Sequence, residues 1–176
     1  MITKLFKKTK KDKEIIDSNS LTKITALLII IFISSSSFAD LTIDMIFIKK
    51  SDRMLHLLKN GDIIKTYNIA LGFEPIGHKH KRGDGKTPEG LYYINKKLHN
   101  SDFHIALQIS YPNKWDKRKA KINSNNPGGL IMIHGQSKNL ELNREDWTNG
   151  CIAVTNEEIE EINKLVELKT PVYISK

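Results

Sequence analysis

Cysteine is nearly absent from this chain, since Cys151 is the only one among 176 residues. A disulfide within the chain is therefore excluded. A long apolar run is also lacking, because the run at 24–33 is about half of the ~20 residues that a membrane-spanning helix needs. We find no internal repeat and no linker between domains. Residues 40–176 are therefore expected to form one compact domain around one core.

A strong charge imbalance is missing as well. The chain has 28 basic and 20 acidic residues, but residues 1–39 hold seven of the basic and three of the acidic ones. Residues 40–176 then carry a net charge of only +4. So mild a charge gives no argument for nucleic-acid binding. It is typical of a soluble protein, and it would also favour approach to an anionic cell-envelope polymer.

The N-terminal segment has the pattern of an export signal. Seven lysines lie before residue 24, the short apolar run follows, and the small residues Ser37 and Ala39 come before Asp40. This pattern predicts a secretory signal peptide at 1–39, cleaved before Asp40; an uncleaved membrane anchor is the alternative. In both cases residues 40–176 would act in the periplasm or elsewhere in the exported cell envelope. The membrane would be contacted only through the N-terminal segment.

Short strand-like segments dominate the rest of the chain. They lie at 41–48, 54–58, 63–70, 91–94, 103–109, 130–133, 151–154 and 171–174. Asn60-Gly61 separates the second from the third and predicts a hairpin, because both residues tolerate the positive φ of a tight turn. The segments 72–90 and 111–129 are rich in Gly, Pro, Asn and basic residues. The first predicts a long exposed loop, and the second predicts another loop or an insertion.

One helix is predicted, at 156–168. Thr155 and Glu158 form a capping-box pattern before it, and apolar residues follow at helical spacing. The expected fold is therefore mainly β, of the mixed α+β class, with one helix after the cysteine.

Cys151 and His134 are the candidate catalytic pair. They lie 17 positions apart, each at the edge of a short apolar strand. If these strands are neighbours, the imidazole can take the thiol proton and the thiolate can attack an acyl carbon. Backbone N–H groups at Gly150 and Cys151 could form an oxyanion hole, and the Gly135 carbonyl could orient the imidazole. The alternative is an inert buried cysteine and a structural histidine.

Two stretches together resemble the L,D-transpeptidase (YkuD-type) catalytic domain. The first is His134-Gly135 with Thr148-Asn149-Gly150-Cys151-Ile152, and the second is the segment 85–92, Gly-Lys-Thr-Pro-Glu-Gly-Leu-Tyr. The resemblance covers most of residues 43–174. Within the family the stretch 146–154, Asp-Trp-Thr-Asn-Gly-Cys-Ile-Ala-Val, is similar to a DWTxGCIAV-type subgroup in which hydrolytic activity is also found.

The resemblance implies an exported enzyme with a β-sandwich-type domain, no cofactor and no metal. It would act on peptidoglycan stem peptides, with Cys151 as nucleophile, His134 as base and the Gly135 carbonyl as the orienting group. The implied substrate-binding residues are Thr87, Pro88, Gly90, Trp147, Thr148 and Asn149.

This chain departs from the family at two positions. Asn149 stands where a His or Arg is common, and Ala153 stands where many members have an Arg two residues after the cysteine. An arginine at that position could bind a carboxylate through two parallel hydrogen bonds from its guanidinium. The usual substrate contact is therefore in question.

Several functions remain open at this point. The thioester on Cys151 could pass to an amine, which would give a cross-link, an exchanged D-amino acid or an attached envelope protein. Water could instead hydrolyse the thioester, as in an L,D-carboxypeptidase or an amidase that releases a bound protein. A non-catalytic wall-binding module is a further alternative. His78 and His80, with His99 and His104, also suggest a metal site, although they form no closed ligand set.

Overall fold

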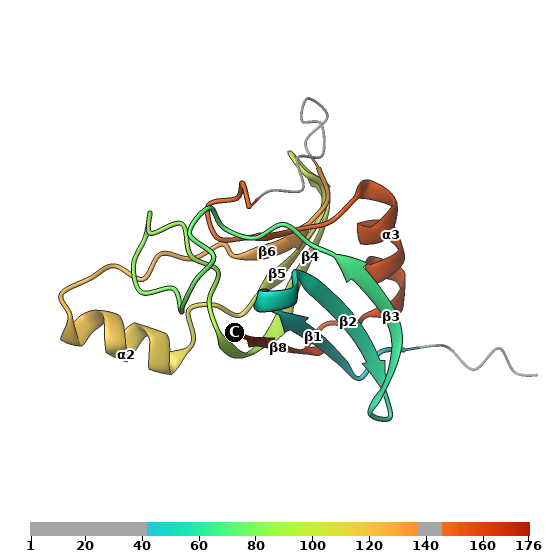
Figure 1. Cartoon of the computed structure of the whole chain (residues 1–176), viewed down its shortest axis with the longest axis horizontal. Coiled ribbons are helices and arrows are strands. Elements are labelled where there is room, and N and C mark those ends of the chain that lie inside the picture. The colour runs from blue at the N-terminus through green and yellow to red at the C-terminus, as the bar shows by residue number, and fades with distance from the viewer. Residues whose placement is uncertain (1–41, 137–145) are drawn as a thin grey trace, which may run out of the picture. The chain divides into compact units, whose positions relative to one another are not determined.

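The computed structural model describes residues 42–136 and 146–176. The predicted signal peptide at 1–39 lies outside these residues, as does the segment 137–145. In chain order the elements are β1 (Met45–Lys49), η1 (Lys50–Asp52), β2 (Met54–Lys59), β3 (Asp62–Asn68), β4 (Gly90–Ser101), β5 (His104–Ile109), α2 (Lys114–Ile122), β6 (Met132–His134), β7 (Ile152–Ala153), α3 (Asn156–Leu165) and β8 (Pro171–Ser175). Figure 1 shows their arrangement.

The eight strands form one mixed sheet in the order β3-β2-β1-β8-β4-β5-β6-β7. Strands β1 and β8 are parallel, and so are β6 and β7, whereas the other neighbours are antiparallel. Strand β4 belongs to both halves of the sheet: its first residues pair with β8 and its later ones with β5. The register is irregular after Ile94, where β4 passes from one partner to the other. The predicted mainly β, mixed fold is confirmed.

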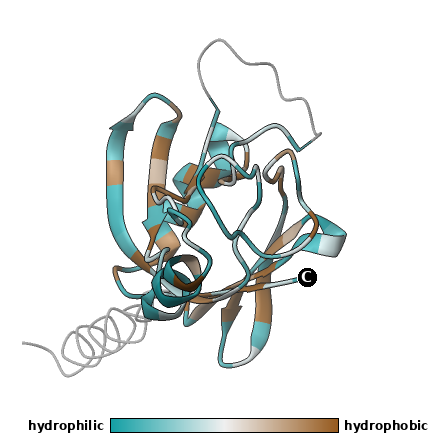
Figure 2. Cartoon of the chain, turned by 90° about the vertical axis from the view of Figure 1, so that its left-hand side faces the viewer, coloured by the Kyte–Doolittle hydropathy of each residue, from teal (hydrophilic) through white to brown (hydrophobic). Residues whose placement is uncertain are grey.

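The predicted hairpin is present between β2 and β3. Asn60 and Gly61 both have positive φ, 54° and 89°, as the two-residue turn requires. Leu55 and Leu57 alternate along β2 with half-buried neighbours, so one face of the hairpin enters the core. Figure 2 shows the same alternation of apolar and polar bands along the strands.

Helix α3 begins as predicted. The Thr155 hydroxyl accepts a hydrogen bond from Glu158 N, and the Glu158 carboxylate accepts one from Thr155 N. Ile159 and Ile162 are fully buried, and the helix packs against β5 and β6. It therefore covers the sheet beside the strand that carries His134.

The prediction that 111–129 is a loop was wrong, because this segment contains helix α2. Asn113 and Asp116 form a capping box at its start. The sequence pattern is weak here because the helix has few apolar residues and buries only Asp116 and Ala120. Helix α2 lies at the opposite end of the view from α3 in Figure 1.

The segment between β3 and β4 has no regular structure, as predicted, but the prediction that it is exposed was wrong. Thr87 and Gly85 are buried, and Lys79 is only 3% exposed. Isolated bridges join Ala70 to Ala153 and Gly72 to Thr148. The loop therefore packs against the segment that carries Cys151. Within 42–136 and 146–176, no helix has the length and apolarity to cross a membrane.

Candidate active site

A tight turn presents Cys151. The Thr148 hydroxyl donates to the Cys151 carbonyl at 2.8 Å and accepts from Gly150 N at 3.0 Å. Gly150 has a φ of 120°, and a Cβ there would lie 2.5 Å from the Lys86 carbonyl oxygen. Position 150 therefore requires glycine both for its conformation and for close packing against the preceding loop.

The Gly150 N–H, which was expected to contribute to an oxyanion hole, donates to the Thr148 hydroxyl. Its contribution is the backbone conformation that exposes the next residue.

His134 lies at the end of β6 and is 3% exposed. Its Nδ1 is 2.6 Å from the Gly135 carbonyl oxygen. Because a carbonyl can only accept a hydrogen bond, Nδ1 carries the proton and Nε2 keeps its lone pair. The imidazole is thus held in the tautomer that a general base acting through Nε2 needs.

The strands next to the two residues are neighbours, which is the condition that a catalytic pair requires. In the parallel pairing of β6 with β7, Ile133 lies opposite Ile152 and His134 opposite Ala153. Cys151 comes one residue before β7, so it lies two positions before Ala153, the residue opposite His134. Its Sγ donates to the Leu130 carbonyl oxygen at 3.6 Å, and the hydrogen bonds of the described residues include none between Sγ and the imidazole.

Two aromatic rings surround the imidazole. The Phe103 ring centroid is 4.5 Å from that of His134, and the Trp147 centroid is 5.8 Å from it. The two rings also contact each other at 6.2 Å. Trp147 thus packs on His134, while Phe103 was missed because nothing in its local sequence marks it.

Burial has the largest effect on the pKa values of both Cys151 and His134. It raises the pKa of the Cys151 thiol, and a backbone hydrogen bond from Met132 and the Lys79 charge oppose this only in part. Burial also lowers the pKa of His134, against the effect of the Gly135 carbonyl. Both groups are therefore neutral at pH 7, with the proton on sulfur and an acceptor on the imidazole.

An ion pair ties the Cys151 segment to the first hairpin. Arg53 Nε lies 3.0 Å from both Asp146 oxygens, and Arg53 Nη2 lies 2.6 Å from Asp146 Oδ2. Asp146 Oδ1 also accepts from Leu71 N at 2.9 Å. One carboxylate therefore joins three segments at the base of the site. The sequence did not reveal this pair, because Arg53 and Asp146 lie 93 positions apart.

Two of the expected substrate contacts are buried threonines whose hydroxyls are hydrogen-bonded within the chain. Thr87 has no exposed surface, and its hydroxyl accepts from Gly72 N at 3.1 Å. Thr148 is 4% exposed, and both of its hydrogen-bonding roles are used within the turn. These hydroxyls position the chain and are not available to a ligand.

The other expected contacts differ in exposure. Pro88 is buried, and Gly90 is half-buried at the start of β4 with a φ of 123°. Asn149 is exposed and lines a pocket beside the cysteine. Among these residues, only Asn149 shares that pocket with Cys151.

A pocket of about 540 Å³ opens next to Cys151. It is lined by Lys79, Arg82, Gly83, Asn126, Gly128, Gly129, Leu130, Ile131, Asn149 and Cys151. Residues from both predicted loop segments, 72–90 and 111–129, contribute to it. Among the described residues, the lining of this pocket includes two cations and no acid, so the pocket suits a negatively charged ligand.

Asp84 organises the loop that forms one wall of the pocket. Its carboxylate accepts from Lys79 Nζ and from His80 N, both at 2.7 Å, and from Lys81 N at 2.9 Å and Lys86 N at 3.2 Å. Burial favours its neutral form, but the Lys79 ammonium and the backbone N–H groups prevail and hold the pKa of Asp84 at about 2. This buried ion pair was not foreseen, because a run of basic residues usually indicates solvated surface.

The histidines considered for a metal site belong to separate networks. His78 Nδ1 accepts from Glu89 N at 3.0 Å and its Nε2 lies 3.2 Å from Asp116, whereas His104 pairs with Glu160 at 2.7 Å. In the described part of the chain, no three His, Cys, Asp or Glu side chains converge as metal ligands would.

Comparison with known proteins identifies the same stretch of chain. The sequence model of the L,D-transpeptidase catalytic domain family, YkuD, matches residues 43–174. YafK of Escherichia coli, which is classed with the L,D-transpeptidases, is 32% identical over 123 residues, or 66% of this chain and 44% of YafK.

Solved structures share the fold. The helical cell shape determining protein Pgp2 of Campylobacter jejuni is 24% identical with a TM-score of 0.61, over 83% of this chain and 54% of Pgp2. Bd1075 of Bdellovibrio bacteriovorus is 26% identical with a TM-score of 0.56, over 80% of this chain and 50% of Bd1075. The chain thus spans about half the length of the relatives it matches.

Proposed function

Because this chain belongs to the L,D-transpeptidase catalytic domain family, we propose that it is an exported cysteine acyltransferase acting on peptidoglycan stem peptides. Cys151 is the nucleophile, His134 the base and the Gly135 carbonyl the group that orients it. Pgp2, which shares the fold, is described as determining helical cell shape, and modification of the cell wall is the corresponding role that we propose here. Membership of the DWTxGCIAV-type subgroup and removal of residues 1–39 stay predictions.

The observation that carries this proposal is the tautomer of His134. A hydrogen bond from Nδ1 to the Gly135 oxygen leaves Nε2 as the acceptor, on the strand next to Cys151. Within the described residues Nε2 has no hydrogen-bond partner, and the neighbouring Cys151 lines a pocket that can admit a ligand.

The proposed reaction begins with transfer of the thiol proton to His134 Nε2. The thiolate then attacks the carbonyl carbon of a diamino acid that precedes a C-terminal D-amino acid, and the carbonyl oxygen becomes an oxyanion near the Cys151 backbone N–H. The imidazolium returns the proton to the leaving nitrogen as the C–N bond breaks. The D-amino acid leaves, and the acyl group remains on sulfur as a thioester.

A second acyl transfer regenerates the enzyme. An acceptor amine attacks the thioester carbon with His134 as base, the C–S bond breaks, and the proton passes to sulfur. The neutral state of both residues suits each half-reaction, because the imidazole is a proton acceptor at pH 7. The acceptor is another stem peptide, a free D-amino acid or an envelope protein.

Product analysis tests this proposal. The full chain is incubated with purified tetrapeptide muropeptides and an added D-amino acid, and the products are identified by mass spectrometry. We expect cross-linked or D-amino-acid-exchanged products with the wild type and none with Cys151→Ala. Shortened tripeptides alone would make the enzyme a hydrolase, and turnover that persists in Cys151→Ala would remove Cys151 from the mechanism.

A further inference from the structure

Two cationic side chains, Lys79 and Arg82, line the pocket beside Cys151, and they differ in their hydrogen-bond partners. Lys79 Nζ lies 2.7 Å from Asp84 Oδ1 and 3.3 Å from the Lys81 carbonyl, and the side chain is 3% exposed. Its charge is therefore compensated within the loop. The Arg82 side chain is exposed, and no hydrogen bond or ion pair from its guanidinium occurs within the described residues. Only the second cation is available to a ligand.

The backbone of Arg82 is fixed although its guanidinium is unpartnered. Arg82 N donates to the Asn126 carbonyl at 2.8 Å, and a Cβ on Gly128 would lie 3.3 Å from Arg82 Cα. Gly128 has a φ of 78° and lets the two walls of the pocket approach this closely. The four hydrogen bonds to Asp84 fix the same turn from the other side. The arginine is thus anchored where both walls meet, in the pocket that contains Cys151.

We propose that Arg82 binds a substrate carboxylate next to the bond that Cys151 attacks. This inference rests on the proposed function. A stem peptide offers two carboxylates near that bond: the C-terminal one of the leaving D-amino acid and the side-chain one of the diamino acid. A guanidinium can hold either with two parallel hydrogen bonds, and the pocket lining contains no acid that would compete for it.

Ala153 cannot supply this contact, because its side chain has no charged or hydrogen-bonding group. Many family members have an arginine two residues after the cysteine, but here Ala153 is 2% exposed and lies opposite His134 in the β6–β7 pairing. Arg82 offers a guanidinium from the loop that lines the pocket beside Cys151.

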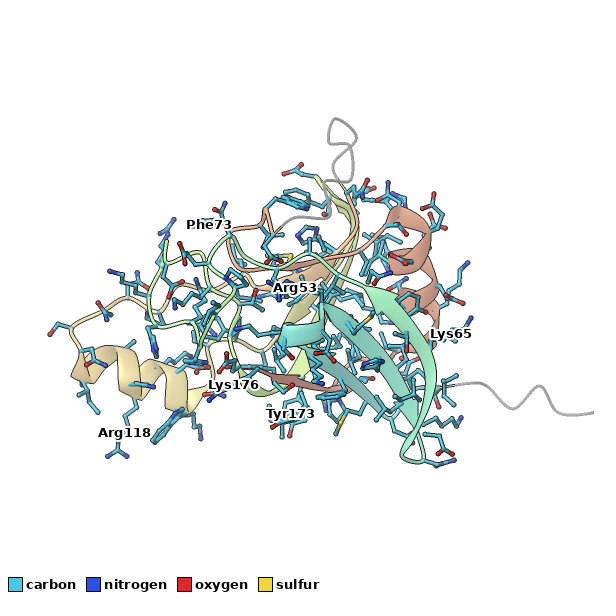
Figure 3. All side chains as sticks on the ribbon, in the orientation of Figure 1. Arg53, Lys65, Phe73, Arg118, Tyr173 and Lys176 are labelled. Carbon is cyan, nitrogen blue, oxygen red and sulfur yellow. The ribbon has the colours of Figure 1, made fainter. Side chains whose placement is uncertain are left out.

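The test is a matched set of substrates and variants of the full chain. The substrates are a tetrapeptide with both carboxylates free, one amidated at the C-terminus and one amidated on the diamino acid side chain. The variants are Arg82→Gln, Arg82→Lys and, as a control, Arg118→Gln. Arg118 is exposed on α2 and points away from the rest of the protein (Figure 3).

For the wild type, amidation of the bound carboxylate is expected to lower kcat/KM about 10- to 100-fold, as for loss of a charge-assisted hydrogen bond. Arg82→Gln should lower kcat/KM by the same factor on the free acid but change little on that one amide. Arg82→Lys should recover part of the loss, and Arg118→Gln should behave as wild type. The amide that shows this non-additivity identifies the carboxylate.

Two outcomes would overturn the inference in distinguishable ways. Turnover by the wild type with equal losses for Arg82→Gln on all three substrates, or with no loss, would remove Arg82 from recognition and leave the proposed function intact. No turnover of any stem peptide by the wild type would remove the proposed function and the role of Arg82 with it.

Discussion

The strands that carry the candidate catalytic pair and the loop that shares their pocket are stabilised by different forces. Strands β6 and β7 are held by apolar burial, with Ile133 and Ile152 both fully buried. The loop 71–89 is held by buried charges instead. Lys50 Nζ binds the Gly77 and Thr87 carbonyls at 2.7 and 3.0 Å and Glu89 at 2.9 Å.

Because of this difference, we expect the strands to determine the reaction and the loop to determine ligand binding. Apolar burial does not depend on pH, and it fixes the backbone that carries Cys151 and His134. The loop depends on ion pairs, so its structure responds to loss of a charge. Changes in the strands should therefore affect the reaction, whereas changes in the loop should affect stability and binding.

Apart from loss of Cys151 itself, the largest effect is expected from His134→Gln. Glutamine cannot take the thiol proton, so kcat/KM should fall about 10³-fold, the usual contribution of a general base. Steady-state assays on tetrapeptide muropeptides would measure this. His99→Gln is the matched control, because His99 is exposed near the far end of β4. Equal losses in both variants would show that His134 has no special role.

Removal of the buried Asp84 charge should have a smaller effect, and this effect should be on the stability of the protein. Asp84 has a folded pKa of about 2, below its ordinary value of 3.8. Its stabilising contribution is therefore complete above pH 4 and is lost as the pH falls from about 4 toward 2. Asp84→Asn should lower the free energy of unfolding by about 2 kcal/mol at pH 7.

Urea unfolding of Asp84→Asn and wild type at pH 7 and at lower pH would measure the difference, which should shrink on acidification. A difference that stays constant with pH would show that the asparagine acts through packing rather than through charge.

The smallest expected effects are pH shifts in the catalytic pair. Burial lowers the pKa of His134, so the acid limb of kcat/KM should have its midpoint below 6.5. Burial raises the pKa of Cys151, so its alkylation by iodoacetamide should follow a pH profile with a midpoint above that of a free thiol. A Cys151 that alkylates rapidly at pH 6 would instead indicate a thiolate–imidazolium pair.

The difference between the two regions also explains what the sequence could reveal. The hairpin at Asn60-Gly61, the strands before His134 and after Cys151, and the capping box at Thr155 follow local rules of turn geometry, periodicity and capping. Each of these is confirmed.

The rest depends on contacts that composition and apolar periodicity do not specify. Burial of Lys79 depends on the whole turn around Asp84, and the role of Arg53 depends on Asp146, 93 positions away. Composition alone indicated solvated loops in these places. Helix α2 was missed because its buried face is too small to give an apolar period, although its capping box at Asn113 and Asp116 could have revealed it.

Intact-protein mass spectrometry tests the central claim most directly. The full chain is mixed with a tetrapeptide and quenched in acid at short times, with Cys151→Ala in parallel. We expect a mass increase equal to the donor without its terminal D-amino acid, labile to hydroxylamine and absent from Cys151→Ala. Turnover without any such adduct, or an adduct that survives in Cys151→Ala, would contradict a thioester on Cys151.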